Sequence, residues 1–247
     1  MTGHRSLAIF GLGAFGRFMV PHLRPHFHVS VHDQHDTADQ ARELGVTSAR
    51  LAQAAAADLI VLAVPVQSLR SLLSSIGPLV RPDATVLDVC SVKLAPIELM
   101  LELLPPSCSV IGLHPLFGPQ SGRDGISNLP VALCPARADA TVVDQVRAFL
   151  RDDLRLRVID TTPDEHDRQM AYVQALTHFV SRAVGSLDLP RTPMATRAYE
   201  RFLQMKADLQ NDSLDLFLTI ERFNPYAAQV RQSVVAAMND LEAQISQ

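Results

Sequence analysis

The chain has 247 residues, which is enough for one large domain or two modest ones. It contains 22 Lys and Arg and 26 Asp and Glu residues, a formal net charge of −4, with no block of like charge. This balance argues against a nucleic-acid-binding protein, which concentrates basic residues on one face. The longest apolar run, residues 59–66, is shorter than the ~20 residues that cross a bilayer, so we expect a cytoplasmic protein without membrane segments.

Short apolar runs alternate with helix-like segments over the first two thirds of the chain. Most runs are too short for a helix and are rich in Val, Ile and Leu, which is typical of strands buried on both faces of a largely parallel sheet. In the last run Arg155 and Arg157 alternate with apolar residues, which predicts an edge strand with one exposed face. The predicted strands are residues 7–10, 29–32, 59–64, 85–89, 110–113, 131–133 and 154–159.

The pattern changes after residue 160. Residues 164–187, which follow Pro163, carry apolar side chains at steps of three and four, and this predicts one long amphipathic helix. We therefore predict an α/β domain over residues 1–160 and a small all-helical domain over residues 161–247. The apolar positions of the long helix are Met170, Val173, Leu176, Val180 and Val184, and further helices are predicted over residues 196–210, 214–222 and 225–246.

Oligomeric state and cysteine chemistry follow from size and spacing. A helical unit of this size buries its apolar faces against a second copy as well as against itself, so we expect a homodimer. The three cysteines, Cys90, Cys108 and Cys134, are widely spaced and odd in number. This fits neither a disulfide framework nor a zinc site, so we expect buried, reduced thiols and no metal.

The first predicted strand leads directly into a GxGxxG motif, GLGAFG over residues 11–16. In such a motif Gly11 makes the tight turn, Gly13 lets the backbone approach a pyrophosphate, and Gly16 lets helix and strand pack closely. The second strand ends at Asp33, near the spacing of an acid that binds ribose. The pattern predicts a Rossmann-type, doubly wound domain, with an ordinary glycine turn as the alternative. The predicted cofactor-binding residues are Gly11, Gly13, Ala14, Phe15, Gly16, Asp33, Val64 and Pro65.

Asp33 also indicates the cofactor. A carboxylate there accepts hydrogen bonds from the ribose hydroxyls but repels a 2′-phosphate, and residues 34–40 contain no arginine, so we expect NAD. The structural alternative is that Asp33 caps the following helix. Val64 and Pro65 end another strand at the edge that faces the ligand crevice, either beside the nicotinamide or as a plain strand end.

Two later strand ends carry polar side chains, in residues 88–93 (DVCSVK) and 112–122 (GLHPLFGPQSG). In a doubly wound sheet both open onto the same crevice as the cofactor. Oxidation of an alcohol requires a group that takes the hydroxyl proton as hydride leaves, and a histidine of near-neutral pKa suits that role. His114 is therefore the candidate base.

The motifs GLGAFG, SVK, GLHPLFGPQSG and EHDRQMAYVQALTHF together resemble the prephenate/arogenate dehydrogenase family of tyrosine biosynthesis. The resemblance extends from the first strand to near Gly185, and the HPLFGP and HDRQMAYVQALTHF segments are its specific part. It implies an NAD-dependent oxidative decarboxylation of prephenate or arogenate. Hydride leaves the ring carbon that carries the hydroxyl, and carbon dioxide leaves the opposite carbon, without a metal.

The resemblance also implies residue roles. His114 accepts a hydrogen bond from the 4-hydroxyl, Ser91 binds near that hydroxyl and the nicotinamide, and Gln174 and His178 line the substrate. The alternative for His178 is a structural role as a histidine of the core. His166, on the same helix face, is expected near the helix start in a capping, interdomain or catalytic role.

One departure from the family concerns the substrate carboxylate. Family members commonly place an arginine just before a stretch resembling residues 210–212, and here Lys206 is the nearest cation, with Arg197 and Arg201 earlier. Lysine lacks the bidentate fork of arginine. Lys206 is therefore a candidate substrate contact, and the choice between prephenate and arogenate stays open. Lys93 is either a ligand contact or a solvated lysine.

Two other functions fit the two-domain layout. One is another NAD(P)-dependent reductase, such as a β-hydroxyacid dehydrogenase or an imine reductase, which would rely on a helical-domain lysine or acid. The other is a regulator that binds NAD without turnover.

Overall fold

The structure is a computed structural model that describes residues 5–209 and 213–246, with the side chains of 206–209 outside the description. The chain divides into two compact units, Met1–His166 and Asp167–Gln247. The boundary predicted at residue 160 coincides with the end of the last strand. The first turn of the following helix, through His166, belongs to the first unit.

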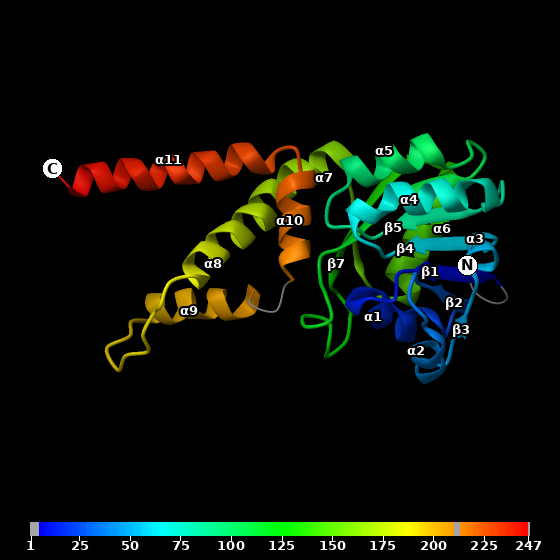
Figure 1. The fold of residues 1–247 in the computed structure, drawn as a ribbon, viewed down its shortest axis with the longest axis horizontal. Helices are drawn as coiled ribbons and strands as arrows, with labels where there is room; N and C mark the ends of the chain where they lie inside the picture. Colours follow the sequence, from blue (N-terminus) through cyan, green and yellow to red (C-terminus); the bar gives the residue numbers. More distant parts are fainter. Residues whose placement is uncertain (1–4, 210–212, 247) are drawn as a thin grey trace. The chain divides into compact units, whose positions relative to one another are not determined.

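The first unit is built on one sheet (Figure 1). Its strands among the described residues follow the order β3-β2-β1-β4-β5-β6-β7-β8. All neighbours are parallel except β6 and β7, which are antiparallel. The bounds are β1 (Ser6–Phe10), β2 (His28–His32), β3 (Thr47–Ser48), β4 (Leu59–Leu62), β5 (Thr85–Asp88), β6 (Ser109–Pro115), β7 (Pro130–Arg137) and β8 (Arg157–Asp160).

Helices cover both faces of this sheet. The helices α4 and α5 pack against each other on one face, and the side chains of α1 and α6 share an apolar cluster with Ile9, Val61 and Leu113 on the other (Figure 1). Every residue of β4 and β5 is buried, as expected for strands covered on both sides. The predicted doubly wound, mostly parallel fold is confirmed. The bounds are α1 (Ala14–Leu23), α2 (Ala38–Glu43), α3 (Leu51–Ala55), α4 (Val66–Ile76), η1 (Gly77–Leu79), α5 (Leu94–Leu103), α6 (Ala140–Ala148) and η2 (Phe149–Asp153).

Two strand predictions need correction. The strand β3 was missed, because its two residues carry no apolar run. The last strand begins at Arg157 instead of residue 154, because Arg155 adopts a left-handed turn with φ 55°. The strand β8 does lie at the sheet edge, as predicted, with Arg157, Ile159 and Asp160 exposed.

The second unit consists of helices. The long helix is continuous from Pro163 to Gly185, but its middle third is π-helical, with η3 (Ala171–Leu176) between α7 (Pro163–Met170) and α8 (Thr177–Gly185). The other helices are α9 (Arg197–Leu209), α10 (Leu214–Phe223) and α11 (Ala227–Ile245), close to the predicted ranges.

The π-helical turn changes which side chains of the long helix are buried. Val173 is 64% exposed, against the prediction that it belongs to the buried face. The wider turn shifts the register, so that Ala171 and Ala175 are buried instead. Ala175 packs with Ile220 and Ala227 in the apolar core of the second unit. An ion pair between Glu221 of α10 and Arg231 of α11 adds a polar contact between these two helices.

Candidate active site

The glycine motif forms a tight turn between β1 and α1. Gly11 has φ +99°, a conformation that an L side chain adopts only with strain. A Cβ added at Gly16 would overlap the carbonyl oxygen of Gly11, so the helix approaches the turn as closely as the spacing predicted. By contrast, a Cβ added at Gly13 would meet nothing within 4 Å. The space above Gly13 is therefore open for a ligand at the start of α1.

Asp33 lies at the end of β2, directly against the glycine turn. Its Oδ2 accepts a hydrogen bond of 2.8 Å from the backbone N–H of Leu12, and its Oδ1 accepts one of 3.1 Å from the N–H of His35. Burial favours the neutral acid, but these hydrogen bonds and the His35 ring together lower the pKa of Asp33. The structure thus places an ionised carboxylate beside the turn, where a ribose hydroxyl could donate to it.

The ends of β4 and β5 join the same edge of the sheet. A Cβ on Gly11 would lie 3.0 Å from Cγ1 of Val64, so the segment Val64–Pro65 borders the glycine turn. The thiol of Cys90 is 3.7 Å from the carbonyl oxygen of Val64, which brings the end of β5 alongside. Burial raises the pKa of the Cys90 thiol, which makes it an unreactive packing group.

A buried ion pair lies beneath the carboxyl ends of β5 and β6. Lys93 is completely buried, and its ammonium group contacts Oδ1 of Asp88 and donates a hydrogen bond of 2.7 Å to the carbonyl oxygen of Leu113. Of the two alternatives predicted for Lys93, the solvated lysine is therefore wrong. Gly112 leaves room for the pair, since a Cβ there would lie 3.0 Å from Cδ of Lys93. The pair anchors the residue immediately before His114.

His114 is the penultimate residue of β6 and is buried. Its Nδ1 lies 2.8 Å from Nε2 of His166, and both imidazoles are 3% exposed. Burial, the neighbouring His166 and the positive charge of Lys93 hold the pKa of His114 well below its usual range. A histidine that resists protonation is available as a hydrogen-bond acceptor over a wide pH range.

This low pKa has a consequence for stability. At pH values between the lowered pKa of folded His114 and the ordinary histidine pKa of 6.5, His114 is protonated in the unfolded chain but not in the folded chain. The free energy of unfolding therefore falls as pH decreases below 6.5. From pH ~7.5 to ~5.5 we expect the wild-type chain to lose more stability than His114→Asn, which has no proton to bind there, by at most about 1.4 kcal/mol for each pH unit. Urea unfolding at the two pH values measures this difference, and equal losses would contradict it.

Ser91 follows β5 and is partly exposed. Because β5 and β6 are parallel neighbours, their carboxyl ends meet at one edge, and Ser91 and His114 both lie at that edge. The first unit thus brings together the glycine turn, Asp33 and the two strand ends that the motifs singled out.

The remaining predicted residues belong to the second unit. His178 is buried on α8, and Oε1 of Gln174, in the π-helical turn, is a buried atom with no hydrogen-bond partner among the described residues. The side chain of Lys206 lies outside the described residues, while Arg197 and Arg201 are exposed on α9. Sequence reasoning missed the Asp88–Lys93 pair, for which the only signal was an acid and a lysine bracketing a strand end.

Two features bear on other kinds of site. Among the described residues, no group of His, Cys, Asp and Glu side chains is arranged to hold a metal ion. In the same part of the chain, every helix is too short or too polar to cross a membrane.

Comparison with known proteins decides the family. The family model described as prephenate dehydrogenase, nucleotide-binding domain, matches residues 22–159, which is more than half of the chain. The chain belongs to the prephenate dehydrogenase family. The match over residues 22–159 confirms the predicted family. A second model, TYRAAT1-like, C-terminal domain, matches residues 183–247.

Individual relatives agree with this assignment. The chain is 30% identical to arogenate dehydrogenase 1, chloroplastic, of Arabidopsis thaliana, over 97% of this chain but 39% of that protein. It is 27% identical to arogenate dehydrogenase 2, chloroplastic, of the same plant, over 97% of this chain and 69% of that protein. Because both plant relatives are chloroplastic by name, the cytoplasmic location of this chain stays a prediction.

A solved structure shares the fold. The prephenate dehydrogenase from A. aeolicus, in complex with hydroxyphenyl propionate and NAD+, superposes with a TM-score of 0.76 at 19% identity. The alignment covers 98% of this chain and 91% of that one.

Proposed function

We propose that the chain is an NAD-dependent dehydrogenase that oxidatively decarboxylates prephenate or arogenate. The observation that carries this proposal is His114, a buried imidazole with a low pKa, at the same sheet edge as the glycine turn and Asp33. Family membership supports the same reaction class.

In this proposal the residues of the first unit bind the cofactor and orient the substrate hydroxyl. The turn at Gly11–Gly16 and the carboxylate of Asp33 would hold NAD, which accepts the hydride when bound. His114 accepts a hydrogen bond from the 4-hydroxyl of the substrate, and Ser91 donates or accepts a second one nearby. Because loss of carbon dioxide makes the ring aromatic, these residues mainly orient the hydroxyl and hold its proton.

The second unit supplies the other substrate contacts in this proposal. Gln174 and His178 lie on the long helix, at the positions that the family resemblance assigns to the substrate. Lys206 is the proposed partner of the ring carboxylate, since a cation is needed for a buried anion.

The reaction is tested by following NADH absorbance with purified protein. Prephenate and arogenate are assayed side by side, with NAD and NADP in parallel, and a panel of β-hydroxy acids and cyclic imines covers the other reductases. Turnover of prephenate or arogenate with NAD supports the proposal. Turnover of only a hydroxy acid or imine, or NAD binding without any turnover, overturns it.

Gly13→Ala separates ligand binding from folding. The added methyl group meets nothing in the protein and the backbone there (φ −66°) suits an L residue, so stability should stay within about 0.5 kcal/mol. The methyl group would instead occupy the space of the pyrophosphate. We expect NAD affinity to fall at least about tenfold, the equivalent of 1.4 kcal/mol. Calorimetric titration with NAD and thermal unfolding measure the two effects, and unchanged affinity would place the pyrophosphate elsewhere.

We also propose that the chain forms a homodimer through its second unit. The helix α11 exposes an apolar stripe at steps of three and four, which a second copy of the same helix would cover. The stripe comprises Val235, Met238, Leu241 and Ile245, which are 44%, 54%, 57% and 80% exposed.

Leu241→Glu tests this interface. A charge in the middle of the stripe should shift the chain from dimer to monomer at micromolar concentration, because an unpaired carboxylate is costly to bury. Light scattering after size-exclusion chromatography measures the mass. The matched control is Ala243→Glu, which is also exposed on α11 but lies on the side away from the stripe, and it should stay dimeric. A monomeric wild-type chain would contradict the proposal.

A further inference from the structure

His114 and His166 form a buried pair within the first unit. The pair joins the end of β6 to the first turn of α7, with 2.8 Å between Nδ1 of His114 and Nε2 of His166 and the ring centroids 5.0 Å apart. The backbone N–H of His166 donates a hydrogen bond of 2.9 Å to the carbonyl oxygen of Thr162, which fixes the base of its side chain. His166 is therefore positioned by the helix backbone, and its ring is buried against His114.

We infer that His166 is a positioning residue that fixes the tautomer of His114, with Nδ1 of His114 donating to Nε2 of His166. This inference rests on the proposed function for its catalytic consequence, but the tautomer itself is a property of the pair.

Counting protons limits the possible arrangements. Two nitrogen atoms at this distance share one proton, so either Nδ1 of His114 or Nε2 of His166 carries it. If His166 were the donor, Nε2 of a neutral His114 would carry the remaining proton and could only donate. If His114 is the donor, its Nε2 keeps a lone pair. Only the second arrangement lets His114 accept the substrate hydroxyl.

The surroundings favour a neutral His114 over a charged one. The ammonium group of Lys93 donates to the carbonyl oxygen of Leu113, the residue before His114, and His114 is buried. A positive charge on His114 would be costly there in the absence of substrate. A neutral His114 carries one proton, which is the condition for a defined tautomer.

The pair also suits the chemical step. As hydride leaves the ring carbon, the hydroxyl proton moves toward Nε2 of His114, and the resulting imidazolium donates from Nδ1 to His166. The electron pair of the breaking bond to carbon dioxide then enters the ring, and the proton returns to the oxygen, which ends as the phenol hydroxyl. No net proton is released, so His166 needs only to accept the hydrogen bond throughout.

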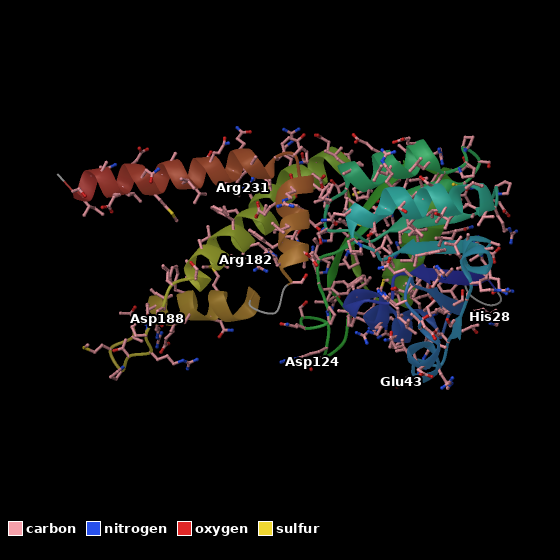
Figure 2. The ribbon with its side chains drawn as sticks, viewed as in Figure 1. His28, Glu43, Asp124, Arg182, Asp188 and Arg231 are labelled. Carbon is pink, nitrogen blue, oxygen red and sulfur yellow. The ribbon has the colours of Figure 1, made fainter. Side chains whose placement is uncertain are left out.

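Two substitutions distinguish a positioning role from simple packing. In His166→Gln the amide oxygen replaces Nε2 as an acceptor, whereas His166→Leu fills similar space and accepts nothing. We expect kcat to fall about 10- to 100-fold in His166→Leu, with KM changed less than about threefold, and His166→Gln to retain most of the lost rate. His28→Leu is the matched control, because His28 is exposed at the start of β2, on the outside of the unit (Figure 2).

The tautomer is measured independently of turnover, by heteronuclear NMR of the full chain with nitrogen-labelled histidine. The His114 signals are assigned by their loss in His114→Asn. We expect the proton on Nδ1 in wild type and His166→Gln, and a shift toward Nε2 in His166→Leu. An Nε2 proton in the wild type, or identical tautomers and kcat in all three, overturns the inference. If the wild type turns over neither prephenate nor arogenate, the proposed function fails while the tautomer result still decides the pair.

Discussion

Replacing His114 with asparagine should lower kcat about 10²- to 10⁴-fold, the usual cost of removing a general base. The amide oxygen of asparagine reaches the position of Nδ1 but not that of Nε2, so the variant loses the acceptor for the substrate hydroxyl. The glycine turn and Asp33 contact other parts of the sheet edge and are unaffected. NAD affinity should therefore stay within about threefold of wild type, well under the 1.4 kcal/mol of a tenfold change.

The measurement combines steady-state kinetics with calorimetric NAD titration, since the chain contains no Trp for fluorescence quenching. His28→Asn, at an exposed position, introduces the same side chain away from the crevice and should turn over at the wild-type rate. Near-normal turnover of His114→Asn would remove this residue from the mechanism. Loss of NAD binding together with turnover would instead assign it to the cofactor site.

The sheet could be predicted from the sequence because strands that are buried on both faces have continuous apolar runs. Runs such as 59–62 and 85–88 are apolar throughout, and both became strands buried on both faces. Strand β3 could not be predicted, since its two residues are exposed and join the sheet by pairing with the backbone of β2. The π-helical turn at Ala171–Leu176 also has no counterpart in a pattern of period 3.6, so Val173 was assigned to the wrong face.

The site was predictable where function depends on backbone geometry. The glycine spacing requires a close turn, and the structure places Gly11, Gly16 and Asp33 against one another as that geometry demands. Side-chain partnerships were not predictable. A sequence does not show that Lys93 turns inward to Asp88, because the same lysine could equally extend into solvent. It also does not show that His166 meets His114, because the two residues are 52 positions apart in the chain.

The Asp88–Lys93 pair leads to the largest expected change in stability. Both side chains are completely buried, and burial raises the pKa of Asp88 against the opposing pull of Lys93. Lys93→Met keeps the length of the side chain but leaves the carboxylate buried without its cation. We expect the free energy of unfolding to fall by about 3–5 kcal/mol, the cost of breaking a buried pair on one side. Denaturation with guanidinium chloride measures this change.

The double variant Asp88→Asn, Lys93→Met shows whether the loss of stability comes from the Asp88 carboxylate that is left without a cation. With both charges removed, a buried pair can be replaced at little net cost, so the double variant should be more stable than Lys93→Met alone. Turnover should nevertheless stay low in both variants, because the hydrogen bond from Lys93 to the carbonyl oxygen of Leu113 no longer holds the residue before His114. If Lys93→Met instead lies within about 1 kcal/mol of wild type, typical of a surface pair, the ammonium group does not stabilise a charged Asp88.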